Sequence, residues 1–310
     1  MSRFIEIDDN PVPDGAEAME FSAPDGARLR GGFFPVDNAR ATVVLMTGWP
    51  EFIEKYFEVI EDLRARKFNV AMMDWRGQGL SDRKSAPKIK WRKFFHLLMS
   101  DLRHFMELHV KARFNGPYIL MTHSMGGMSA LLLLASGYPA FERAVLCAPM
   151  TRLLREPHNK ITDFISGLAV IFGAAAIPVI RKRDHAEHFE GNIFTSDPVR
   201  HARFRQLLHT APEAANKAPT YGWVNAAIKA SYSIHRPHAL DGIKTPTLII
   251  TAGKERQIDG TDHAVIAAAN PNIRLKTVPG SLHEIMMEQD EMRTAYFDAF
   301  DEFVEPIFQP

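Results

Sequence analysis

A buried strand that turns directly into a helix through a serine is the feature that most constrains this chain. Residues 118–123 are an apolar run preceded by Gly116-Pro117, which predicts a strand, and the leucine-rich segment from Met125 onward predicts a helix. Ser124 lies at the corner, and Gly126 allows the helix to pass close to the strand. Such a corner lifts the hydroxyl above the sheet, as a nucleophile requires. A serine that only caps the helix is the alternative.

Strand and helix patterns alternate on both sides of this corner. The apolar runs 41–46 and 68–73 predict buried strands, and residues 53–66 between them predict a helix. Two strands joined by a helix form a parallel pair, so the sheet is covered on both faces. Residues 16–36 predict an antiparallel hairpin around Asp25-Gly26. Further strands are predicted at 141–150, 245–252 and 273–278, and further helices at 91–113, at 260–269 and from the loop 279–284 to about residue 305.

The alternation stops between about residues 151 and 240, where helical periodicity dominates. We therefore predict a helical cap at 151–240, inserted between a first core part at 1–150 and a second core part at 241–310. Residues 161–180 are mostly apolar but interrupted by polar residues, glycines and a proline. These interruptions argue against a membrane span, so we expect a buried or pocket-lining helix, with transient contact with a membrane surface as the alternative.

Composition excludes several classes of function. The 37 basic and 37 acidic residues give zero formal net charge, so nucleic acid is not an expected partner. The one cysteine, Cys147, excludes an internal disulfide and is expected in the core. No Cys/His cluster has zinc-like spacing, so no metal is expected. The N-terminus carries acids where a signal peptide needs its apolar region, which favours a cytoplasmic location.

Candidate catalytic residues follow three predicted strands. Ligands of an open α/β sheet bind outside the carboxyl ends of its strands. A serine nucleophile needs an imidazole to take its proton and an acid to orient the imidazole. His283, after a glycine-containing loop, is the expected base, and Glu255 is the expected acid, with Asp259 as the alternative. His123 adjoins Ser124 but should point to the other side of the strand, so a structural role is expected.

Attack by a serine on an ester creates an oxyanion that needs hydrogen-bond donors. One expected donor is the backbone N–H of Met125, directly after the nucleophile. The other is the backbone N–H of Trp49, in the loop after the strand at 41–46.

Several motifs resemble one branch of a known superfamily. Residues 47–51 resemble an H-G-x-x-E oxyanion loop, 74–81 a D-x-R-G-x-G-x-S turn, and 123–127 the nucleophile elbow, of the monoacylglycerol lipase and bacterial lysophospholipase branch of α/β-hydrolases. Residues 194–198 and 219–223 resemble segments of the lysophospholipase cap. The resemblance implies the α/β-hydrolase fold, a mostly parallel central sheet with helices on both faces and a helical cap.

Carried over by position, the resemblance implies Ser124 as nucleophile, Glu255 as acid, His283 as base, and Trp49 and Met125 as oxyanion donors. The chain departs from the usual pattern in three places. Thr47 replaces a histidine, Thr122 replaces a glycine, and a glutamate replaces the more frequent aspartate of the triad. None of these changes removes a catalytic group, because the oxyanion donors are backbone groups and a glutamate can orient a histidine.

The expected function is therefore that of a serine hydrolase that cleaves a carboxylic ester through an acyl-enzyme. A lysophospholipid or monoacylglycerol is the expected substrate, because the apolar segment 161–180 could wall an acyl chain. The alternatives are a carboxylesterase or acyltransferase for small soluble esters and a non-catalytic binding protein that keeps the hydrolase fold. We expect no cofactor, and a location in the cytoplasm or at the membrane periphery.

Overall fold

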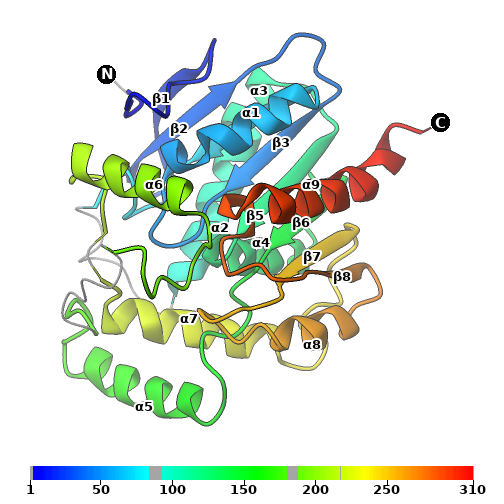
Figure 1. Cartoon of the computed structure of the whole chain (residues 1–310). Helices are drawn as coiled ribbons and strands as arrows, with labels where there is room; N and C mark the ends of the chain where they lie inside the picture. Colours follow the sequence, from blue (N-terminus) through cyan, green and yellow to red (C-terminus); the bar gives the residue numbers. More distant parts are fainter. Residues whose placement is uncertain (1–2, 84–92, 180–187, 217, 310) are drawn as a thin grey trace.

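The computed structural model describes residues 3–83, 93–179, 188–216 and 218–309 (Figure 1). In these residues eight strands form one sheet in the order β1-β2-β4-β3-β5-β6-β7-β8. The strands are β1 (Glu17–Ser22), β2 (Arg28–Phe34), β3 (Ala41–Met46), β4 (Phe68–Met73), β5 (Tyr118–His123), β6 (Arg143–Cys147), β7 (Thr247–Ala252) and β8 (Ile273–Val278). β2 pairs antiparallel with β1 and β4, and the other neighbours pair parallel. The predicted hairpin and the mostly parallel sheet are confirmed.

Helices cover both faces of the sheet, because successive strand residues point to opposite sides. Val43 packs in the apolar cluster with α1 (Phe57–Ala65) and α9 (Asp290–Val304), whereas its neighbour Val44 packs with α2 (Phe94–Phe105) and α4 (Met125–Ala135). All six residues of β3 are buried. The sheet is therefore the middle layer of three (Figure 1).

The predicted core helices are present with shifted ends. The helix predicted at 53–66 is a 3₁₀ turn over Ile53–Tyr56 followed by α1. The helix predicted at 91–113 comprises α2, a π-helical turn over Met106–Val110 and α3 (Lys111–Arg113), while residues 91 and 92 lie outside the described part. The last helices are α8 (Asp262–Ala268), a 3₁₀ turn over Ile285–Met287, α9 and a 3₁₀ turn over Glu305–Ile307.

Among the described residues between β6 and β7 there are three helices: α5 (His158–Ile171), α6 (Pro198–Thr210) and α7 (Tyr221–Ile234). α7 packs against α2 and α4 of the core, and α6 contacts the 3₁₀ turn that precedes α1. α5 packs against α7 and lies beyond it, at the lower edge of Figure 1. The boundaries of the cap at residues 151 and 240 stay a prediction.

The prediction that residues 161–180 form a buried or pocket-lining helix is wrong. α5 ends at Ile171, and its largest apolar side chains face outward, with Phe164 68% and Ile171 70% exposed. The side of α5 toward α7 is instead polar, since Asn225 of α7 donates hydrogen bonds to Asp163 and to Ser166. Residue 180 lies outside the described residues. No helix in the described ranges is long and apolar enough to cross a membrane.

Candidate active site

Ser124 occupies a strained corner between β5 and α4. Its backbone angles, φ +47° and ψ −112°, are rare for a residue with a side chain. The corner is held by backbone hydrogen bonds, in which the Ser124 N–H donates to Cys147 O at 3.0 Å and the Ser124 carbonyl accepts from Met150 N at 2.9 Å. Gly126 is required next to it, because a Cβ atom there would lie 2.7 Å from the carbonyl oxygen of Thr47.

The side chains of Ser124, His283 and Glu255 form a continuous chain of hydrogen bonds. Ser124 Oγ lies 2.9 Å from His283 Nε2, and His283 Nδ1 lies 2.8 Å from Glu255 Oε2. The other carboxylate oxygen of Glu255 accepts from the backbone N–H groups of Gln257 at 2.8 Å and Ile258 at 3.3 Å. A serine, a histidine and a carboxylate in this arrangement can activate the hydroxyl for attack on an acyl carbon.

The two candidate acids have different surroundings. Asp259 accepts a hydrogen bond from Thr261 Oγ1 at 2.5 Å and faces Arg155, whereas Glu255 reaches the imidazole. Gly260 leaves room for the longer glutamate, because a Cβ at that position would lie 2.9 Å from the Glu255 side chain. Burial raises the pKa of Glu255, but the hydrogen bonds from His283 and from the backbone have the larger combined effect, so the pKa lies below its usual value. The group is therefore an anion at neutral pH.

The loop after β3, residues 47–51, lies directly beside the nucleophile. A Cβ atom on Gly48 would come within 3.0 Å of Ser124 Cβ, so only glycine fits this close approach. The next residue, Trp49, packs its ring 5.0 Å from that of Trp223 in α7. Within the described ranges, neither the Trp49 nor the Met125 backbone N–H donates a hydrogen bond, so both are available to an incoming oxyanion.

Comparisons with known proteins agree with this geometry. The family described as serine aminopeptidase, S33 matches residues 37–290. The chain belongs to this family of α/β-hydrolases. It is 29% identical over 302 residues to lysophospholipase L2 of Escherichia coli, covering 93% of this chain and 87% of that protein. It is 27% identical over 272 residues to the probable lysophospholipase L2 of Haemophilus influenzae, covering 87% and 85%.

Solved structures show the same fold. A soluble variant of monoglyceride lipase from Saccharomyces cerevisiae, in complex with a substrate analogue, superposes with a TM-score of 0.73 at 20% identity. The match covers 94% of this S33-family chain and 96% of the other. The α/β-hydrolase fold predicted from the motifs is confirmed.

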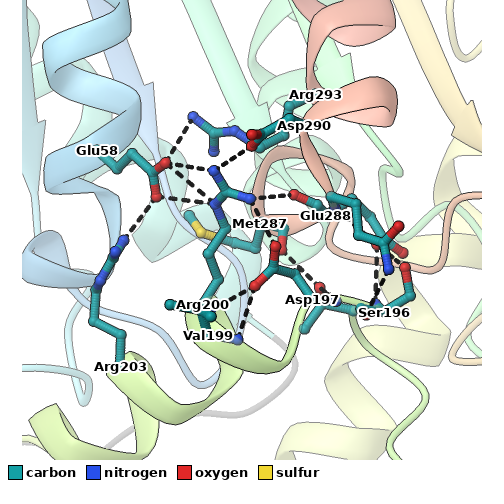
Figure 2. Close-up of polar contacts among 12 residues, drawn as sticks. Glu58, Ser196, Asp197, Val199, Arg200, Arg203, Met287, Glu288, Asp290 and Arg293 are labelled. Carbon is teal, nitrogen blue, oxygen red and sulfur yellow. Dashed lines mark hydrogen bonds and ion pairs between the residues drawn. The ribbon is translucent and has the colours of Figure 1, made fainter.

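Cap residues hold the loop that carries His283. This histidine loop, residues 279–289, joins β8 to α9. The backbone N–H of Glu284 donates to Phe194 O at 2.7 Å, and that of Leu282 donates to the buried Glu288 carboxylate at 2.7 Å. The same carboxylate accepts from Ser196 N at 2.9 Å and Ser196 Oγ at 2.5 Å (Figure 2). One buried carboxylate therefore ties the backbone next to His283 to the chain before α6.

Arg200 of α6 joins the cap to two core helices (Figure 2). Its guanidinium donates to Glu58 of α1 at 2.6 Å, to Asp290 at the start of α9 at 2.7 Å and to the Glu288 carbonyl at 2.9 Å. Arg203 adds a hydrogen bond to Glu58 at 2.7 Å. Because the Glu58 pairs are partly buried and all of these contacts share Arg200 or Glu58, they form a network and not an isolated surface pair.

The sequence analysis missed a buried polar cluster behind Ser124. It consists of Glu51, Lys55, Tyr56, His123 and Glu284, which are linked by hydrogen bonds and ion pairs. Glu51 was visible as the last residue of the motif at 47–51, but its partners come from distant parts of the chain. Among the described residues, no group of three or more His, Cys, Asp or Glu side chains is arranged to hold a metal ion.

The choice of acid can be tested by Glu255→Gln and Asp259→Asn. Glu255→Gln removes the charge that orients His283, so we expect Ser124 to react with a fluorophosphonate on the order of 10³- to 10⁴-fold more slowly. Asp259→Asn should change the rate less than about threefold, because this side chain does not reach His283. Intact-protein mass spectrometry over time gives both rates, and the reverse pattern would assign the acid to Asp259.

The cap-to-core network predicts a loss of stability in acid. Burial raises the pKa of Glu58, but hydrogen bonds from Arg200 and Arg203 and the charge of Arg293 lower it from 4.5 to about 2. Since this pKa is depressed in the folded state, the contribution of Glu58 to stability is complete above pH 4.5 and is lost as the pH falls toward 2. Glu58→Gln should therefore lower the urea midpoint clearly at pH 7 and much less at pH 2.5.

The control for this experiment is Glu61→Gln on the same helix. Glu61 is about half exposed and, within the part of the chain that the structure describes, pairs only with Arg64 of its own helix, so its substitution should leave the midpoint nearly unchanged at both pH values. If the difference in urea midpoint between wild type and Glu58→Gln is the same at pH 7 and at pH 2.5, the depressed pKa of Glu58 is contradicted.

Proposed function

We propose that this chain is a serine hydrolase that cleaves the carboxylic ester of a single-chain lipid, a lysophospholipid or monoacylglycerol. The observation that carries the proposal is the unbroken chain of hydrogen bonds from Ser124 through His283 to Glu255. The lipid assignment rests on the two bacterial relatives named lysophospholipase L2, which align with most of this chain. The family name alone does not select a substrate.

In the proposed reaction, His283 Nε2 takes the proton of Ser124 Oγ as this oxygen attacks the ester carbon. Glu255 holds the opposite N–H of the ring and stabilises the imidazolium. The carbonyl oxygen becomes an oxyanion and accepts hydrogen bonds from the backbone N–H groups of Trp49 and Met125. His283 then gives its proton to the departing alcohol, and an acyl group remains on Ser124.

Water completes the cycle. His283 removes a proton from a water molecule, whose oxygen attacks the acyl carbon, and then returns the proton to Ser124 Oγ. This step releases a fatty acid and restores the hydroxyl group of Ser124. If an alcohol replaces water in this step, the product is a new ester, which is the acyltransferase alternative.

We also propose that residues 151–240 act as a cap over the core parts 1–150 and 241–310. The partly exposed Trp49 packs against the buried Trp223 of α7, so cap and core together form an aromatic pair beside the expected oxyanion donors. Such a pair suits the apolar part of an acyl chain. A carboxylesterase for small soluble esters would gain little from it.

We further propose that the protein is located in the cytoplasm and binds the membrane peripherally. In this proposal α5 makes the contact with the membrane surface. An amphipathic helix with an unpartnered apolar face is typical of interfacial binding. On α5 the polar face meets α7, while the following apolar side chains are exposed: Ile161, Phe164, Ile165, Leu168, Ile171 and the adjacent Phe172. The lipid substrate would then reach the enzyme from the surface where it resides.

Catalysis is tested with Ser124→Ala, His283→Ala and esters of increasing acyl length. We expect a fluorophosphonate to label wild type at Ser124 and neither variant. Each buried methylene contributes about 0.8 kcal/mol, so kcat/KM should rise by up to roughly fourfold per carbon between about four and about twelve carbons. A fall over that range would favour the soluble-ester alternative, and an unlabelled but folded wild type would favour the binding-protein alternative.

Membrane contact is tested by flotation with phosphatidylcholine vesicles, with and without phosphatidylglycerol. Phe164→Ser and Ile171→Ser should each lower partitioning about tenfold, because each removes a side chain from the apolar face. The control is Leu108→Ser, since Leu108 is 57% exposed on the core and away from α5. Equal partitioning of all variants would contradict the proposal, whereas dependence on phosphatidylglycerol alone would indicate binding through charge.

A further inference from the structure

The carboxylate of Glu51 organises the buried polar cluster behind Ser124. One of its oxygens accepts from Gly48 N at 2.5 Å, from Tyr56 OH at 2.7 Å and from His123 Nδ1 at 2.9 Å. The other oxygen accepts from Lys55 Nζ at 2.6 Å. Gly48 precedes Trp49, so this carboxylate holds the loop that presents one of the two expected oxyanion donors.

The ring of His123 faces an acceptor at both of its nitrogens. Nδ1 lies 2.9 Å from Glu51 Oε2, and Nε2 lies 3.3 Å from the backbone carbonyl oxygen of His283. A carbonyl oxygen and an ionised carboxylate can each accept a hydrogen bond but cannot donate one. Either neutral tautomer of His123 would therefore turn a nitrogen lone pair toward an oxygen lone pair. Only the imidazolium, which carries a proton on both nitrogens, satisfies both contacts.

The charges of the cluster lead to the same form of His123. Glu51 and Glu284 are two buried or nearly buried carboxylates, and Lys55 lies 2.6 Å from each of them. With a neutral His123 the cluster would hold one uncompensated negative charge, which is costly away from water. The imidazolium brings the sum of these four charges to zero.

Two further titratable groups beside His123, Tyr56 and Cys147, do not change this balance. Burial, together with the Glu51 charge, raises the pKa of Tyr56 well above its usual value, and burial does the same for Cys147, the neighbour of His123 on β6. Both are neutral at physiological pH. Burial alone would lower the pKa of His123, but the Glu51 charge and hydrogen bond raise it above its ordinary value.

We propose that His123 is held as an imidazolium and is a positioning residue that connects the oxyanion loop, through Glu51, to the backbone of His283. This inference rests on the proposed function of Ser124 and His283. One cation then connects the loop that carries the expected oxyanion donor to the backbone of the expected base. Its ring centroid lies 4.9 Å from that of His283.

The pH dependence follows from the direction of the shift. Because the pKa of His123 is raised in the folded state, its stabilising contribution is complete below the ordinary value of 6.5 and is lost as the pH rises through the folded value. Loss of this proton would leave one ring nitrogen facing an oxygen without a hydrogen bond and would unbalance the cluster. We therefore expect kcat/KM to fall on the alkaline side with the titration of His123.

His263 provides an internal comparison in the same molecule. It is also buried, but its Nδ1 faces the Thr251 hydroxyl at 2.7 Å, which can donate, and its Nε2 faces the Pro149 carbonyl at 2.7 Å. A neutral ring with its proton on Nε2 satisfies both partners. Burial also lowers the pKa of His263. Two buried histidines are thus expected in different protonation states at one pH.

The test is NMR of the full chain labelled with ¹⁵N-histidine, at pH 7.5. We expect protons on both ring nitrogens of His123 and on one ring nitrogen of His263, with signals assigned by their loss in His123→Gln and His263→Gln. A single ring proton on His123 in wild type would overturn the proposal. This measurement does not depend on any substrate or on the activity of the two variants.

Kinetics separate this proposal from the proposed function. His123→Gln should lower kcat on the order of 100-fold with KM for a short soluble ester changed less than about threefold, and should abolish the alkaline fall. An unreactive wild type would overturn the proposed function. An active wild type whose kcat and alkaline limb are unchanged in folded His123→Gln would overturn only the positioning role.

Discussion

The site depends on the backbone conformation of Ser124. Its positive φ is maintained because the residue is fixed on both sides, by Cys147 at the end of β6 and by Met150 just beyond. Gly126 lets α4 begin against the backbone of Thr47 at the end of β3. The corner therefore requires three adjacent strand ends, and the hydroxyl reaches His283 only because the sheet is assembled around it.

The backbone around His283 is held from two directions. On the cap side, Glu288 binds both Leu282 and Ser196, and Phe194 accepts from Glu284. On the core side, the His283 carbonyl lies against His123. A movement of the cap segment 194–200 would thus act on the histidine loop through hydrogen bonds, whereas His123 contacts the same loop from the end of β5.

Much of the fold was predictable because the core strands are buried on both faces. Such strands are short, continuous apolar runs that can be recognised in the sequence itself. The sequence favoured Glu255 as the acid but left Asp259 as an alternative, because both are carboxylates in one loop. The structure distinguishes their surroundings, since the Glu255 carboxylate contacts His283 and accepts from the backbone of Gln257 and Ile258, while Gly260 leaves room for its side chain. The apolar segment at 161–180 was misassigned, because periodicity reveals that a helix is amphipathic but not which face meets the protein.

The sequence alone determined most of the sheet and predicted that Ser124, the loop with Glu255 and Asp259, and His283 follow strands, because parallel strands bring their carboxyl ends to one edge. Only the tertiary structure decided the outward apolar face of α5 and the surroundings of His123. The ring of His123 meets Glu51, 72 residues away, and the carbonyl of His283, 160 residues away. Its protonation depends on those two acceptors, and no local pattern in the chain records that they converge.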